Sequence, residues 1–313
     1  MFQLRSALSQ SWTVNRPLTF VGVTSAVMLL ACLFGLVLDH RMITGMPAWD
    51  KPAKFAVSVG LYSFTLIWML GHVTGTRARF ARAAASLSAA GFIVELVIIA
   101  VQAARGTSSH FNISTPLDTA LYAAMGGFVA LIWGMNFLAA VLLTLQPLPG
   151  RAFALSLRLA LFLTLIGGSV GALMTVPSSA QLQQSHPTLA GAHTVGGVDG
   201  GPGLPFLGWS TVHGDLRVSH FVGLHALQVL PLLFWLVSCC RSWGETQRVG
   251  LIWIGAASYL GVMGLLFWQA ERGQSVIAPD ALTLVLAGLL ATVTAFGTLL
   301  VLRTRRTVTS LTS

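Results

Sequence analysis

Charged residues are scarce in this chain. Only 9% of its 313 residues are Asp, Glu, Lys or Arg, against about 25% in soluble domains. Hydrophobic residues make up 55%, and the mean hydropathy is +0.78. So few charges cannot cover the surface of a water-soluble domain, which excludes that class. We expect an all-α integral membrane protein whose main partner is the lipid bilayer.

Cysteine and familiar catalytic signatures are also lacking. Cys32, Cys239 and Cys240 lie in or beside apolar runs. We expect them to pack as small apolar side chains and to form no disulfide framework. The sequence has no Walker phosphate-binding motif, no His-Glu-x-x-His zinc motif and no Cys-x-x-Cys pair. Nucleotide chemistry therefore has no support.

What the chain has in abundance is apolar runs. A membrane-spanning helix needs roughly 20 mainly apolar residues. The first run is longer than the roughly 7–15-residue apolar region of a signal peptide, so we interpret it as a spanning helix. Eight runs qualify: Leu18–Leu38, Phe55–Val73, Ala83–Ala104, Thr119–Leu145, Leu157–Val176, Phe221–Cys240, Val249–Gln269 and Ala281–Leu302.

The basic residues predict the orientation of these eight helices. Twelve of the 18 Lys and Arg residues fall on one side of the runs and six on the other. The positive-inside rule places the richer side, with both termini, in the cytoplasm. We expect a multi-pass protein of the plasma membrane, in a bacterium the inner membrane. The net charge of +9 resides in short loops, so we expect no nucleic-acid partner. Most acids and histidines lie on the outer side.

A short motif indicates an internal repeat. Gln-Ala-Ala-Arg-Gly-Thr-Ser at 102–108 returns at 269–275 as Gln-Ala-Glu-Arg-Gly-Gln-Ser, and at nearly the same offset Lys54-Phe55 corresponds to His220-Phe221. Because four helices per unit is an even number, both units should have the same orientation. The predicted parts are a cytoplasmic segment 1–17, four-helix units 18–150 and 151–302, a long outer loop 177–217 within the second unit, and a basic cytoplasmic tail 303–313. We expect 178–203 of this loop to be mobile and 204–209 to lie on the bundle or at the membrane interface.

Two Gln/Arg pairs end the repeated helices. Gln102 with Arg105, and Gln269 with Arg272, are three residues apart and therefore share a helix face. One interpretation is capping, since a cation at a helix C-terminus contributes about 0.3–1 kcal/mol. The other is a binding site for a small anionic ligand, because Arg guanidinium groups bind carboxylate or phosphate. Further ligand-binding candidates are Asp118, Asp215 and Arg217.

Four histidines are candidate ligands of haem or a transition metal, the cofactors that imidazole suits. They are His110, His213, His220 and His225. His110 lies in a short polar loop. If the sixth helix begins near His213, then His213, Arg217 and His220 share one face. His225 lies one turn inside the membrane, where an ionisable group is a functional candidate by default.

Glu95 falls in the middle of the third predicted helix. A carboxylate there costs about 2.5–3.5 kcal/mol on insertion scales. We expect it to face the bundle interior, either protonated or bonded to Asn136 or Tyr62, and it is a candidate proton relay.

Three functions fit these features. The first, which we favour from the sequence, is a membrane redox or cofactor-binding protein with a polar His/Arg/Asp site near the outer face. The layout of two four-helix halves resembles haem A synthase, although the fourth and eighth runs here contain no histidine. The second is a carrier for a small molecule or weak acid. The third is a non-catalytic sensor or assembly factor whose outer loop binds a protein partner.

Overall fold

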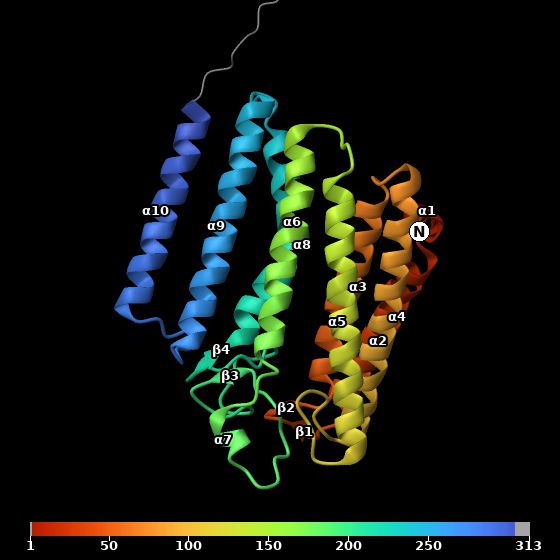
Figure 1. Cartoon of the computed structure of the whole chain (residues 1–313), viewed down its shortest axis with the longest axis vertical. Helices are drawn as coiled ribbons and strands as arrows, with labels where there is room; N and C mark the ends of the chain where they lie inside the picture. Colours follow the sequence, from red (N-terminus) through yellow and green to blue (C-terminus); the bar gives the residue numbers. More distant parts are fainter. Residues whose placement is uncertain (1, 304–313) are drawn as a thin grey trace, which may run out of the picture.

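Eight long apolar helices dominate the computed structural model, which describes residues 2–303 (Figure 1). Residues 304–313 of the expected tail lie outside the described part. Each helix overlaps one predicted run and is long and apolar enough to cross a membrane, as in a polytopic membrane protein. They are α2 (Arg16–Leu38), α3 (Asp50–Leu70), α4 (Gly75–Arg105), α5 (Pro116–Thr144), α6 (Arg151–Leu173), α8 (Leu216–Cys239), α9 (Glu245–Glu271) and α10 (Ala281–Arg303).

Local sequence explains where several of these helices begin and end. Asn15 caps α2 by accepting a hydrogen bond from the Leu18 backbone N–H at 2.9 Å. Thr115 caps α5 in the same way, accepting from Asp118 at 3.1 Å. Such caps satisfy backbone donors that lack a partner inside the helix. Gly106 ends α4 with φ of 75°, a left-handed conformation that glycine adopts without strain.

The helices form two groups, α2–α5 and α6 with α8–α10, which stand side by side in Figure 1. Corresponding pairs pack in each group: α2 on α3 and α4 on α5 in the first, α6 on α8 and α9 on α10 in the second. The groups meet chiefly through α5 against α6, with a smaller contact between α3 and α8. The duplication itself stays a prediction from the sequence.

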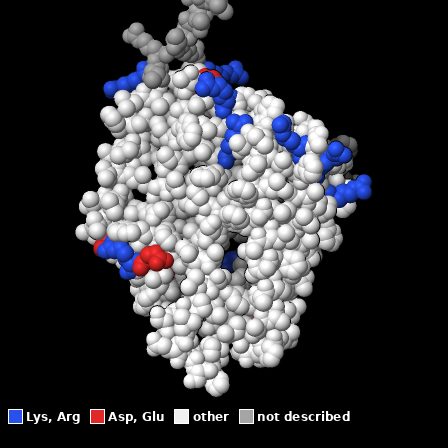
Figure 2. Space-filling model, viewed as in Figure 1, with Lys and Arg blue, Asp and Glu red and all other residues white. Residues whose placement is uncertain are grey.

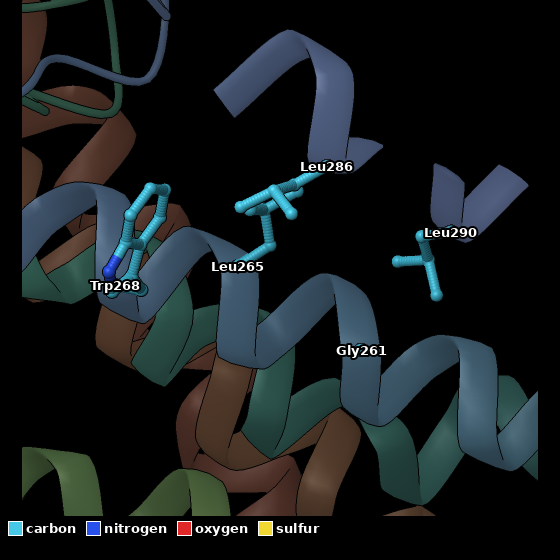
Figure 3. Close-up of a pocket in the computed structure, with 5 residues that line it drawn as sticks. All are labelled: Gly261, Leu265, Trp268, Leu286 and Leu290. Atoms are coloured by element: carbon cyan, nitrogen blue, oxygen red, sulfur yellow. The ribbon is translucent and has the colours of Figure 1, made fainter. Parts of the chain in front are cut away.

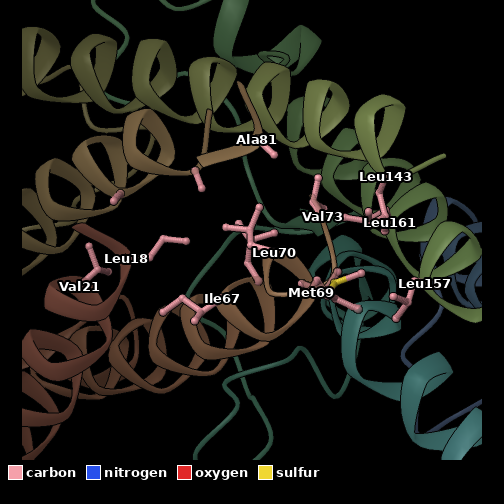
Figure 4. Close-up of a cluster of buried hydrophobic side chains, with 14 of the residues drawn as sticks. Leu18, Val21, Ile67, Met69, Leu70, Val73, Ala81, Leu143, Leu157 and Leu161 are labelled. Atoms are coloured by element: carbon pink, nitrogen blue, oxygen red, sulfur yellow. The ribbon is translucent and has the colours of Figure 1, made fainter. Parts of the chain in front are cut away.

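The main apolar core lies toward the end of the bundle where α2 and α6 begin (Figure 4). Leu18 and Leu157 are fully buried there, with Leu70 from the end of α3 and Leu143 from the end of α5. Because these side chains come from both groups, the core closes the space between the groups at this end. Figure 2 shows Lys and Arg side chains gathered near the same end. We predicted this end to be cytoplasmic and call it the basic end.

The opposite end carries the longer loops, and we call it the loop end. It holds hairpin β1 (Met42–Ile43) with β2 (Met46–Pro47), the short helix α7 (Ser179–Leu182), and β3 (Thr194–Val195) paired with β4 (Gly214–Asp215). At the basic end, α1 (Phe2–Val14) is a helix that the apolar runs did not predict.

The long loop is bound to the first helix group. The Ile113 backbone N–H donates to the Thr188 carbonyl at 2.9 Å, and the Ala190 N–H donates to the Phe111 carbonyl at 2.8 Å. The segment we expected to be mobile therefore has fixed partners. Trp209 packs against Phe221, with ring centroids 5.6 Å apart, so the end of segment 204–209 lies on the bundle.

Candidate functional site

Two lysines stand in the first turn of α3, at the loop end. Lys54 pairs with Asp50, its Nζ 2.5 Å from Oδ2, and donates to the Leu207 carbonyl at 3.1 Å. Lys51 is half-buried, and within residues 2–303 it has no assigned hydrogen bond or ion pair. An ammonium without a partner in a partly buried position is available to a ligand.

Arg217 occupies the corresponding turn of α8. Its guanidinium binds Asp215 through both carboxylate oxygens, at 2.9 and 2.6 Å, and donates to the Gly208 carbonyl at 2.6 Å. Asp215 is only 2% exposed and also accepts from the Ser210 backbone N–H at 2.8 Å. This network fixes the start of α8, and it places the helix boundary three residues later than the His213 start we considered.

His220 lies one turn further along α8. Its Nδ1 donates to the Gly167 carbonyl of α6 at 2.8 Å. Because Nδ1 carries the proton in this bond, Nε2 of the neutral ring is the nitrogen that can accept a hydrogen bond. Gly167 and Gly223 permit this close approach, since a Cβ on Gly223 would lie 2.3 Å from the Gly167 Cα.

Two loop residues form a His/carboxylate pair. His193 Nδ1 donates to Asp199 Oδ2 at 2.7 Å, and the His193 and Thr194 backbone N–H groups also donate to this carboxylate. Burial lowers the pKa of His193 below its ordinary value, against the opposing effect of Asp199. Burial raises the pKa of Asp199, but the bonds from His193 and Thr194 outweigh it and hold that pKa below its usual range.

His110, from the loop between α4 and α5, faces the same region. Its ring centroid is 5.7 Å from that of Phe55 on α3. Burial, reinforced by Lys51, His193 and His220, places the pKa of His110 well below its ordinary value of 6.5. The ring is therefore neutral at pH 7.

These side chains converge between the two helix groups. Lys54 and Arg217 donate to the adjacent carbonyls of Leu207 and Gly208, and the Phe111 ring contacts the rings of both His110 and His193. Figure 2 shows a hollow between the groups with a basic side chain at its depth. We call the set the central basic cluster: Lys51, Lys54, His110, His193, Arg217 and His220.

The arrangement suits an anion. The N-terminal ends of α3 and α8 both lie here, and the partial positive charge of helix N-termini adds to that of the cationic side chains. The same side chains are less suited to a metal ion, because residues 2–303 hold no group of three His, Cys, Asp or Glu side chains arranged to bind one.

The other two histidine candidates have local contacts. His213 lies against Gly197, where an added Cβ would meet its ring at 2.3 Å. His225 Nδ1 donates to the Phe221 carbonyl one turn back at 2.8 Å, and the two rings lie 4.0 Å apart.

The first Gln/Arg pair forms a closed network. Arg105 and Gln102 both donate to Asp118 Oδ1, at 2.7 and 2.9 Å, and Thr115 donates to Oδ2 at 2.6 Å. Asp118 is only 3% exposed. The network joins the end of α4 to the start of α5, as the capping interpretation expects.

The second pair has a similar arrangement. Arg272 binds Asp280 at 2.5 Å and lies over the Trp268 ring, 4.4 Å from its centroid. Gln269 donates to the Ser275 carbonyl at 2.7 Å, as Gln102 does to Ser108 at 3.5 Å. Each arginine is thus paired with a carboxylate that follows it in the chain. Arg105 pairs with Asp118 at the start of α5, and Arg272 pairs with Asp280 in the loop before α10.

Glu95 is buried, as expected, but it does not bond Asn136 or Tyr62. Tyr62 donates to Asn136, so the two groups expected to hold the acid hold each other. Glu95 is 3% exposed, and neither of its carboxyl oxygens has a hydrogen-bond partner among the described residues.

Two other features do not form a polar site. The groove between α9 and α10 is lined by Gly261, Leu265, Trp268, Leu286 and Leu290 and carries no titratable group (Figure 3). Residues 167–171 read Gly-Gly-Ser-Val-Gly, which matches the Gly-x-Ser-x-Gly pattern of a serine nucleophile. They lie inside α6, where Ser169 bonds the Leu165 carbonyl at 3.0 Å, not on the strand-to-helix turn such a nucleophile requires.

Comparison with known proteins adds no assignment: no family model, curated protein or solved structure matches the chain. The candidate site is therefore inferred from the geometry of the structure alone.

Sequence reasoning counted Lys51 and Lys54 only as orientation signals. One sequence signal could have found them: they are the only lysines among 18 basic residues, and they lie three positions apart. His193 and Asp199 carried no such signal. They become a pair through the conformation of the outer loop, which periodicity does not predict.

Proposed function

We propose that this multi-pass membrane protein binds a small anion, carrying a carboxylate, phosphate or sulfate group, at the central basic cluster. The observation that carries the proposal is the convergence of Lys51 and Arg217. Like charges repel, so holding them together in a hollow costs free energy that an anion would recover.

The two-group architecture supports a carrier over a static receptor. The hollow lies between helix groups that contact each other weakly through α3 and α8. The apolar core of Leu18, Leu70, Leu143 and Leu157 closes the path at the basic end. A site between two similar units and sealed at one end suits a carrier in which one unit rocks against the other. In this proposal the loop end faces outward.

The first test is binding. Purified protein in detergent is titrated with sodium sulfate, phosphate and succinate, and Trp fluorescence is followed, because Trp49 and Trp209 lie beside the cluster. We expect a saturable change and a rise in Tm with at least one of these anions. Lys51→Met should shift both responses to anion concentrations about tenfold higher or more. If none of the three anions changes fluorescence or Tm in the wild-type protein, the proposal fails.

The second test is transport. Proteoliposomes loaded with buffer are supplied with the radiolabelled form of the anion that binds. Uptake above that of Lys51→Met vesicles supports a carrier, whereas binding without uptake restricts the protein to a receptor or sensor role. The visible spectrum of the same sample tests the redox alternative, since bound haem gives a strong absorption band.

A further inference from the structure

The long loop makes a tight turn at residues 204–209, shortly before β4. The Leu204 backbone N–H donates to the Trp209 carbonyl at 2.8 Å and closes the base of this turn. At its tip the Leu207 N–H donates to the Pro205 carbonyl at 2.7 Å. A bond to the carbonyl two residues back makes the tip a γ-turn. We call this segment the 204–209 turn.

Phe206, at the centre of the γ-turn, has a strained backbone. Its φ is 61°, a left-handed conformation that is uncommon outside glycine, and the γ-turn with a positive φ is rare and strained. The Phe206 side chain is 82% exposed, so its packing does not offset the strain. Such a conformation persists only where surrounding contacts impose it. The 204–209 turn therefore needs bonds from outside to keep this shape.

Those bonds come from the central basic cluster. The Lys54 ammonium donates to the Leu207 carbonyl at 3.1 Å, and the Arg217 guanidinium donates to the adjacent Gly208 carbonyl at 2.6 Å. Lys54 belongs to the first helix group and Arg217 to the second, so the turn lies between the starts of α3 and α8. A negatively charged oxygen is a stronger acceptor for either cation than a neutral carbonyl. An anion that bridged Lys54 and Arg217 would therefore compete with the turn for the same donors.

We propose that the 204–209 turn is a lid over the central basic cluster. The Leu207 and Gly208 carbonyls hold it closed on Lys54 and Arg217, and a bound anion displaces it by taking these two donors. The strain at Phe206 favours release, because the turn relaxes once its carbonyls are free. The inference rests on the proposed function and adds the step by which the site admits its ligand.

Substitutions at Phe206 test the lid, because this exposed side chain contributes neither charge nor packing to the site. Asn tolerates a positive φ better than Phe does, so Phe206→Asn should stabilise the closed lid. A β-branched residue tolerates it worst, so Phe206→Val should favour the open lid. Apparent affinity is proportional to the fraction of protein that is open. Sulfate titrations followed by Trp fluorescence should show binding about threefold weaker or more in Phe206→Asn and stronger in Phe206→Val, relative to the wild type.

Hydrogen exchange gives an independent measurement in the wild-type protein. The Leu204 and Leu207 amides are bonded inside the turn. Displacement of the lid should make both exchange faster at saturating sulfate, whereas ligand binding ordinarily slows exchange by stabilising the fold. Leu182→Asn is the matched control for the titrations, because it changes an exposed apolar side chain of α7 outside the turn. It should bind sulfate as the wild type does.

The proposal requires both results. Exchange that is unchanged or slower with sulfate overturns the lid and leaves the anion site intact. Affinities that are equal in the two Phe206 variants, or that shift in the same direction, do the same. Phosphate and then succinate replace sulfate if sulfate does not bind. Failure of all three anions to bind the wild-type protein would remove the proposed function, and the lid with it.

Discussion

Lys51 and Arg217 are each the second residue of a helix that begins at the loop end, α3 and α8. In each helix a second nitrogen-bearing side chain follows three positions later, Lys54 in α3 and His220 in α8. The two helix groups thus place basic residues at matching positions, and Lys54 and Arg217 donate to the adjacent carbonyls of Leu207 and Gly208.

This relationship predicts opposite effects of one substitution. Lys51→Met removes a cation held near Arg217 and Lys54, so it should raise the Tm of the empty protein. The same change should weaken anion binding about tenfold or more, because a charge-assisted hydrogen bond contributes about 1.5–3 kcal/mol. Arg41→Gln is the control, since Arg41 is exposed and paired with Asp39. A loss of Tm with Lys51→Met would contradict the repulsion argument.

The crossing of α6 and α8 predicts a packing defect. A Cβ at residue 223 would meet Gly167 backbone at 2.3 Å. Backbone atoms cannot move aside as a flexible side chain can. Gly223→Ala should therefore destabilise the protein by about 1–3 kcal/mol and should also displace His220 from the Gly167 carbonyl. Gly264→Ala, whose added methyl meets nothing within 4 Å, should be neutral or stabilising. Thermal unfolding followed by circular dichroism compares the two.

The two Arg/Asp pairs predict different sensitivity to salt. Asp118 is buried and accepts bonds from Gln102, Arg105 and Thr115, so Asp118→Ala should cost about 2 kcal/mol or more at any ionic strength. Asp280 has a side chain 36% exposed. Removing the Asp280 carboxylate should lower the free energy of unfolding by less, and this loss should disappear as salt screens the Arg272–Asp280 pair. Equal losses for both variants at high salt would be inconsistent with this assignment.

The His193/Asp199 pair predicts that acid loosens the long loop. The pKa values of His193 and His110 are lowered in the folded protein, so the unfolded state binds more protons below the ordinary value of 6.5. The stability from these groups is complete above pH 6.5 and is lost as pH falls through their folded pKa values. The lowered pKa of Asp199 acts in the same direction at lower pH.

Hydrogen exchange measures this effect at the His193 and Thr194 amides, which bind Asp199. After correction for the intrinsic rate, protection should fall by up to about tenfold per pH unit for each coupled proton. His193→Gln should flatten the dependence, and Asp199→Asn should reduce protection already at pH 7. Protection independent of pH in the wild type would contradict the prediction.

The spanning helices could be predicted because each is a property of one continuous stretch. Every apolar run from Leu18 to Leu302 corresponds to a helix, since lipid requires the backbone to satisfy its own hydrogen bonds. Helix starts were predicted less well. The start of α8 depends on Asp215 capping the chain after β4, and β4 exists only because β3 pairs with it.

The site was harder to predict because its members come from distant segments. Arg217, His110 and His220 were recognised as polar residues in apolar surroundings. Lys51 was not recognised as a site residue, because its role depends on Arg217, which lies on another helix. The expected partners of Glu95 were wrong for the same reason: Tyr62 and Asn136 satisfy each other, a pairing that no local pattern indicates.

Helix α10 packs chiefly against α9, and Thr283 is its only residue described as buried. It also leaves the ribosome after the other seven spanning helices. Those seven, including α3 and α8 with the basic cluster, can associate before α10 enters the bilayer. Assembly of the anion site can therefore be complete while the chain is still being synthesised, and α10 joins afterwards along a surface of α9 that the site does not use.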